Sequence, residues 1–199
     1  MTDSPRWFTD TQPGHSQWYI ERFRKMAAEG ADLAGEARFM DALMAPGSDV
    51  LDAGCGPGRV GGQLHDRGHG VVGVDVDPEL IEAANQDYPG PRWLQGDLAE
   101  LDLSAHGITE PFDAAVVAGN VMTFLAEGTA DLVLTRLREH VRTDGAIVIG
   151  FGFGRGYSRE TFDTDIAHAG LRVEQRFGTW DLRPLTSESD FMVTVLRVP

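Results

Sequence analysis

The sequence has a single cysteine, Cys55, among its 199 residues. One cysteine cannot form an intrachain disulfide, and no Cys/His cluster has the spacing of a zinc site. No apolar run is long enough to cross a bilayer. The first 17 residues contain acids, prolines and polar residues where a signal peptide needs a basic and then an apolar segment. We therefore expect a cytoplasmic protein without structural metal.

Basic residues are also scarce. The chain has 17 Lys and Arg against 31 Asp and Glu, which gives a formal net charge of -14. A surface with this charge repels nucleic acid and anionic lipid, and no basic run offsets it. We expect a small or neutral partner, with no nucleic acid and no membrane surface bound. The oligomeric state does not follow from these features.

Two short helices are expected at the start of the chain. Tyr19, Phe23 and Met26 recur at helical spacing, and a second apolar stripe follows until a Pro-Gly pair breaks it. The length of the chain fits one domain. We expect residues 1–46 to form the N-terminal helices and residues 47–199 to form the core of that single domain.

Strand and helix patterns alternate after these helices. Strands are expected at 49–53, 70–76, 92–95, 112–118 and 146–151, and helices at 58–67, 77–86, 129–140 and 158–169. A turn is expected at 143–145 and a mobile loop at 150–156. Two final strands, within 171–177 and 190–198, have only a loop between them, which permits an antiparallel pair. The pattern predicts an α/β fold with a parallel sheet covered by helices.

The segment "VLDAGCGPGR", residues 50–59, is a glycine-rich turn between a strand and a helix. Such a turn brings a ligand against backbone N–H groups, because glycine has no Cβ and adopts unusual dihedral angles. The dinucleotide fingerprint is G-x-G-x-x-G, but Arg59 takes the place of its third glycine and Gly58 comes one position early. This spacing disfavours a nicotinamide-dependent dehydrogenase, which stays as a minor alternative.

The same turn resembles motif I of the class I S-adenosylmethionine (SAM)-dependent methyltransferases, with an acidic residue two places before Gly54. "VVGVDVDPELIEAA" is similar to the second-strand motif of that family and ends its strand at Asp75, 75 - 54 = 21 residues after Gly54. "LQGDLAEL", "FDAAVVAGNVMTFL" and "LREHVRTDGAIVIGF" are similar to later segments of the family. The resemblance covers residues 49–151 and, more loosely, the last two strands.

The resemblance implies a doubly wound, Rossmann-like sheet of seven strands, mostly parallel with an antiparallel seventh strand and with helices on both faces. It implies SAM as cofactor, S-adenosylhomocysteine (SAH) as product and methyl transfer to a small-molecule acceptor. A non-catalytic SAM-binding or regulatory module is the alternative. The segment "GNVMTF" replaces the Asn-Pro-Pro-Tyr pattern of enzymes that methylate nucleic-acid bases or glutamine, which disfavours those substrates.

The resemblance also implies roles for individual residues. Asp52 is expected to bind the ammonium group of SAM, and Asp75 is expected to accept hydrogen bonds from both ribose hydroxyls. Val76 would press on the adenine face, while Asp97 and Leu98 would contact its edge. Further candidates for cofactor binding are Tyr19, Gly54, Cys55, Gly56 and Gly119.

Several of these residues also have simpler interpretations. Asp52 and Asp75 are acidic residues that loop amides can satisfy, and Asp97 is suited to capping a helix. Cys55 is a small turn residue with no neighbouring base or positive charge in sequence, so we expect no nucleophilic role for it.

The N-terminal helices are expected to form a lid, because such segments cross the ligand cleft in related enzymes. Tyr19 and Phe23 would then close over SAM, although packing against the sheet edge is an equal alternative. His15 is the candidate general base if the acceptor must lose a proton, and a capping or surface role is the alternative.

Overall fold

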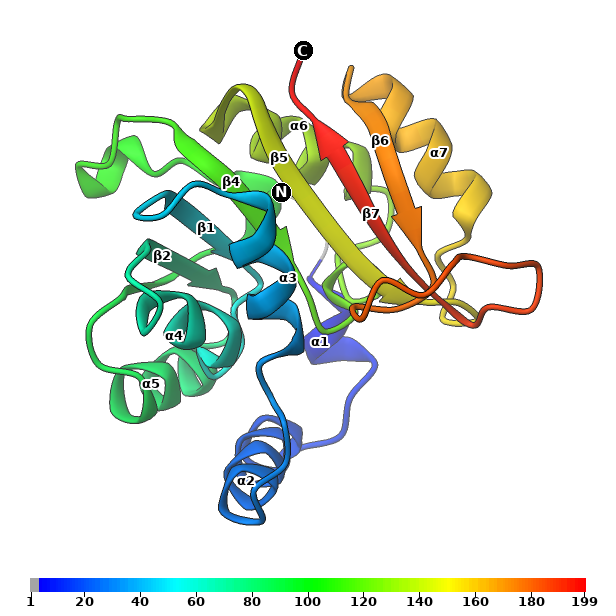
Figure 1. Ribbon diagram of the computed structural model, residues 1–199. Coiled ribbons are helices and arrows are strands. Elements are labelled where there is room, and N and C mark those ends of the chain that lie inside the picture. Colours follow the sequence, from blue (N-terminus) through cyan, green and yellow to red (C-terminus); the bar gives the residue numbers. More distant parts are fainter. Residues whose placement is uncertain (1–3) are drawn as a thin grey trace.

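A seven-stranded β-sheet runs through the molecule (Figure 1). The computed structural model describes residues 4–199. The strands are β1 (Asp49–Ala53), β2 (Gly70–Asp75), β3 (Arg92–Gln95), β4 (Phe112–Val117), β5 (Val141–Gly152), β6 (Arg172–Phe177) and β7 (Phe191–Arg197), in the spatial order β3-β2-β1-β4-β5-β7-β6. β7 runs antiparallel to both of its neighbours, β5 and β6, and the other pairs of neighbouring strands are parallel. The predicted fold class and the antiparallel last strand in sequence are confirmed.

Helices cover both faces of this sheet. One face carries α3 (Gly35–Leu43), α4 (Arg59–His65) and α5 (Pro78–Asp87), and the other carries α6 (Ala130–His140) and α7 (Arg159–His168). Short 3-10 helices are η1 (Leu98–Glu100), η2 (Ser104–His106) and η3 (Val121–Thr123). In β1, Val50 packs toward α3 and α4 while Leu51 packs toward α6. Because both faces are buried, the central strands are continuous apolar runs.

The N-terminal region lies beyond the end of the sheet at which the parallel strands finish (Figure 1). It contains α1 (Arg6–Thr9) and α2 (His15–Ala28) before α3, so three helices precede β1 where two were predicted. The prediction missed α1 because four residues are too few to show a helical period. An ion pair between Arg24 Nε and Asp87 Oδ2, at 2.8 Å, joins α2 to α5.

Two expected loops are partly strand. Pairing between β4 and β5 jumps from Phe112/Val141 to Ala114/Ala146, so the expected turn at 143–145 is an irregularity within β5. The loop expected at 150–156 was predicted to begin too early in the sequence, because Phe151 and Gly152 still pair with β7. Gly150 is in the strand as well, where Trp180 leaves no space for a Cβ.

Among the helices of residues 4–199, none combines the length and the apolar character that a bilayer crossing requires. The same residues contain no group of three or more His, Cys, Asp or Glu side chains arranged to hold a metal ion.

Candidate active site

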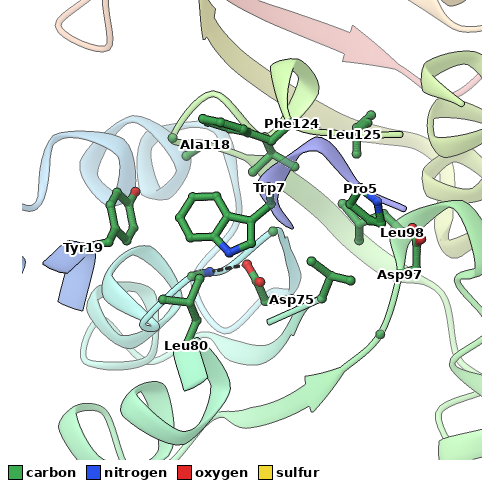
Figure 2. A pocket seen from close by; sticks show the side chains of 16 residues that line it. Pro5, Trp7, Tyr19, Asp75, Leu80, Asp97, Leu98, Ala118, Phe124 and Leu125 are labelled. Atoms are coloured by element: carbon green, nitrogen blue, oxygen red, sulfur yellow. Dashed lines mark hydrogen bonds between the residues drawn. The ribbon is translucent and has the colours of Figure 1, made fainter. Parts of the chain in front are cut away.

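A pocket lies at the carboxyl ends of the parallel strands, beside β1 and β4 (Figure 2). Chain crossovers leave these two neighbouring strands in opposite directions, and ligands of α/β sheets bind in such a crevice. Eight of the predicted cofactor-binding residues line it: Tyr19, Gly54, Gly56, Asp75, Val76, Asp97, Leu98 and Gly119. Asp52, Cys55 and the proposed base His15 do not belong to this lining.

The glycine turn forms one wall of the pocket. Gly54 and Gly56 have φ angles of +77° and +55°, in the left-handed region that favours glycine. A Cβ on Gly54 would collide with the side chain of Val121. The first atom that a Cβ on Gly56 would meet is Cε1 of Tyr19, at 3.6 Å, so this glycine presents an open face to the pocket.

Asp75 ends β2 beside this turn and is 9% exposed. Its Oδ2 accepts a hydrogen bond from Gly56 N at 2.8 Å, and its Oδ1 accepts one from Asp77 N at 3.0 Å (Figure 2 shows the first). Burial raises the pKa of Asp75 to about 6. The amide-binding interpretation is therefore confirmed. Because a carboxylate has about four acceptor positions, Asp75 keeps capacity for the ribose hydroxyls, and that role stays a prediction.

Asp52 lies beneath the turn and not on the pocket wall. It is 1% exposed, and its Oδ2 accepts a hydrogen bond from the amide of Gly61 in α4 at 2.8 Å. Burial raises the pKa of Asp52 to about 7. The simpler interpretation of this residue was nearly right, since the amide belongs to a helix and not to a loop. Asp52 is not part of the pocket lining, so its binding of the SAM ammonium stays a prediction.

Cys55 is buried next to these carboxylates. Burial, with smaller contributions from Asp75 and Asp52, raises the pKa of its thiol well above the usual value. A thiol of this kind is a poor nucleophile at neutral pH.

The position of Asp97 is compatible with both predicted roles, helix capping and contact with the adenine edge. Its side chain accepts a hydrogen bond from Ala99 N at 2.9 Å and caps η1. It also lines the pocket together with Leu98. The capping interpretation is confirmed, and the contact with the adenine edge stays a prediction.

His15 does not line the pocket. It begins α2, and its ring packs edge-on against Trp7 with the ring centres 4.9 Å apart. Its role as a general base stays a prediction that this geometry does not support. Phe23 was expected to close over SAM. It packs against Tyr19, at 4.9 Å between ring centres, and is not part of the pocket lining.

Trp7 is a pocket residue that the sequence did not indicate. Its ring packs edge-on against Tyr19 and Phe124, at 5.6 and 5.4 Å between centres, and its backbone N–H donates to the Phe124 carbonyl at 3.2 Å. Other lining residues missed from the sequence are Pro5, Leu80, Gly96, Ala118, Val121, Phe124 and Leu125. Most are apolar residues without a motif of their own.

Asn120 connects the ends of β4 and β5. Its φ angle is +67°, and its Oδ1 accepts a hydrogen bond from Gly152 N at 2.7 Å. The amide oxygen is therefore already engaged within the protein.

Comparison with known proteins gives consistent matches. The family model described as "Methyltransferase domain" matches residues 50–145. A crystal structure of a TehB-like SAM-dependent methyltransferase from Corynebacterium glutamicum is 44% identical, with a TM-score of 0.88 over 94% of this chain and 100% of that one.

Two curated proteins are more distant. The trans-aconitate 2-methyltransferase of Azoarcus sp. is 31% identical over 66% of this chain and 49% of its own length. The magnesium-protoporphyrin O-methyltransferase of Rhodobacter capsulatus is 32% identical over 65% of this chain and 56% of its own length. The chain thus spans about half the length of the curated relatives that it matches.

Proposed function

The chain belongs to the class I SAM-dependent methyltransferases, and from this premise we propose that it transfers the methyl group of SAM to a small-molecule acceptor. The observation that carries the proposal is the pocket itself. It places the open face of Gly56 beside the Asp75 carboxylate, with Val76 and Leu98 forming apolar walls. A nucleoside with a ribose diol and an apolar base face has the matching chemistry.

When bound, SAM supplies a methyl group that is activated by the sulfonium. The residues of this chain then have to bind SAM, orient it toward the acceptor and exclude water from the pocket. Trp7, Tyr19 and Phe124 form an aromatic wall that keeps solvent from the pocket. Orientation and removal of water account for much of the rate in such a displacement, so an acid–base pair is not required. Within residues 1–46, the helices α1 and α2 are proposed to act as the lid that carries Trp7 and Tyr19, because α3 is packed on the sheet.

Three features of the chain favour a small acceptor. Little of the described chain lies outside the sheet and its covering helices, and the net charge of -14 disfavours nucleic acid. The segment after Asn120 also lacks the Pro-Pro-Tyr that follows the asparagine in enzymes that methylate the amino groups of bases or glutamine. The cytoplasmic location stays a prediction from the sequence.

The proposal is tested by incubating the protein with methyl-labelled SAM and a protein-free metabolite extract. We expect the label to appear in a small molecule, and not when SAM is supplied without the extract. If SAH binds but no extract yields a labelled small molecule, the non-catalytic SAM-binding module is the better description. Label that appears only in added protein or nucleic acid would contradict the acceptor class.

A further inference from the structure

Asp77 has a buried carboxylate that connects three helices. The residue is 2% exposed. Its Oδ1 accepts a hydrogen bond from Glu79 N at 2.9 Å and caps α5. Its Oδ2 accepts from the indole Nε1 of Trp7 at 2.7 Å and from the hydroxyl of Ser16. Capping needs one oxygen only, so the second oxygen is devoted to α1 and α2.

The indole held by Asp77 is also part of the cofactor pocket. Figure 2 shows the Trp7 ring in the middle of the lining residues, between Tyr19 and Asp75. It also packs against the cluster formed by Ile20 of α2 and by Leu80 and Ala83 of α5. The four residues of α1 include none that is buried, and its ion pair between Arg6 and Asp10 stays within the helix. Apart from Trp7, Arg6 Nη1 donates a long, exposed hydrogen bond to the Arg155 carbonyl, at 3.4 Å. The shorter, part-buried bond of Trp7 to Asp77 is thus the stronger polar attachment of the α1 side chains.

With Trp7 in this position the pocket is narrow. Its volume is about 80 Å³, whereas sites for small-molecule ligands have volumes of about 300–1,000 Å³. A cofactor the size of SAM cannot enter such a space without displacement of a wall. The glycine turn and the strand ends are continuous with the sheet. Of the walls outside the sheet, α2 and η3 each contain a buried residue, whereas α1, which carries Trp7, contains none.

We propose that Trp7 is the gate of the cofactor pocket and that Asp77 is the positioning residue that keeps this gate shut in the free protein. The inference rests on the proposed function, because it concerns entry of SAM and SAH. A ligand that binds only the open form associates in proportion to the population of that form. The hydrogen bond between Trp7 and Asp77 therefore sets how fast the cofactor enters.

The test uses surface plasmon resonance, with the full chain immobilised and SAH as the probe. Trp7→Phe keeps an aromatic ring but loses the donor to Asp77. Asp77→Asn keeps an oxygen that can cap α5 but turns an amide N–H₂ toward the indole N–H. We expect either variant to raise the association rate of SAH at least about tenfold, which corresponds to about 1.4 kcal/mol of stabilisation of the closed form.

Arg24→Gln is the matched control. The pair between Arg24 and Asp87 also joins α2 to α5, but it is exposed and lies outside the pocket lining. Exposed pairs contribute little, so we expect the association rate to stay at the wild-type value. Melting curves without ligand show whether each variant is folded.

The proposal is overturned if folded Trp7→Phe and Asp77→Asn proteins associate with SAH at the wild-type rate. It is also overturned if only the dissociation rate rises, because Trp7 would then be an ordinary contact of the bound ligand. A wild-type protein that does not bind SAH at all would contradict the proposed function itself, which is a separate result.

Discussion

Replacing Gly56 with valine is expected to weaken SAH binding at least about a hundredfold. A branched side chain at this position would extend from the open face of Gly56 into the pocket that Tyr19 and Asp75 line. The φ angle of +55° is also unfavourable for valine. A hundredfold loss of affinity corresponds to about 2.8 kcal/mol of binding free energy. The steric clash of one branched side chain in a narrow pocket can cost more than this. Calorimetric titration with SAH measures the effect.

Gly47→Val is the control for backbone strain. Gly47 has a φ angle of +77°, and no atom lies within 4 Å of the position of its Cβ. We expect this variant to lose stability from the same kind of strain while it keeps wild-type affinity for SAH. Normal SAH affinity in a folded Gly56→Val protein would show that the turn has a structural role only.

Replacing Asp75 with alanine is expected to weaken SAH about a hundredfold. If the carboxylate accepts both ribose hydroxyls, two charge-assisted hydrogen bonds are lost, each worth about 1.5 kcal/mol or more. The change also leaves Gly56 N and Asp77 N without their acceptor, so the melting temperature should fall. Asp75→Asn should fall between alanine and wild type, because it keeps one acceptor oxygen. Titration of folded protein measures the affinity separately from stability.

The pH dependence separates ribose binding from a purely structural role. The pKa of Asp75 is about 6 in the free protein because of burial, and the ribose hydroxyls need the ionised form. Wild-type affinity for SAH should therefore decrease as the pH falls through about 6, and Asp75→Asn should lack that decrease. Because the folded pKa lies above the ordinary value, protonation of this group stabilises the fold between about pH 6 and 4. Acid unfolding caused by Asp75 would thus not explain the loss. Unchanged SAH affinity in Asp75→Ala would refute the ribose assignment.

The sheet and the glycine wall could be predicted because their signals are local. The run from Val50 to Ala53 is buried on both faces and apolar except for Asp52, and the glycines at 54, 56 and 58 follow directly in sequence. Asp75 was predicted at the pocket from the resemblance to the second-strand motif, and it ends β2 in the pocket lining.

Other parts of the site depend on contacts that the sequence does not show. Trp7 belongs to a helix of four residues, and its position is fixed by Asp77, seventy residues later. Asp52 follows the expected pattern, but its side chain is directed by the amide of Gly61 in α4 and not by the pocket. Motifs thus identified the residues near the cofactor, whereas the orientation of their side chains came from packing between elements.

The most direct test of the central claim is a calorimetric titration of the wild-type protein with SAH and, separately, with NAD. We expect one saturable site for SAH. We expect no heat of binding for NAD, because Arg59 occupies the position of the third glycine of the dinucleotide fingerprint. A protein that binds NAD as tightly as SAH, or that binds NAD alone, would contradict the assignment of this pocket to SAM.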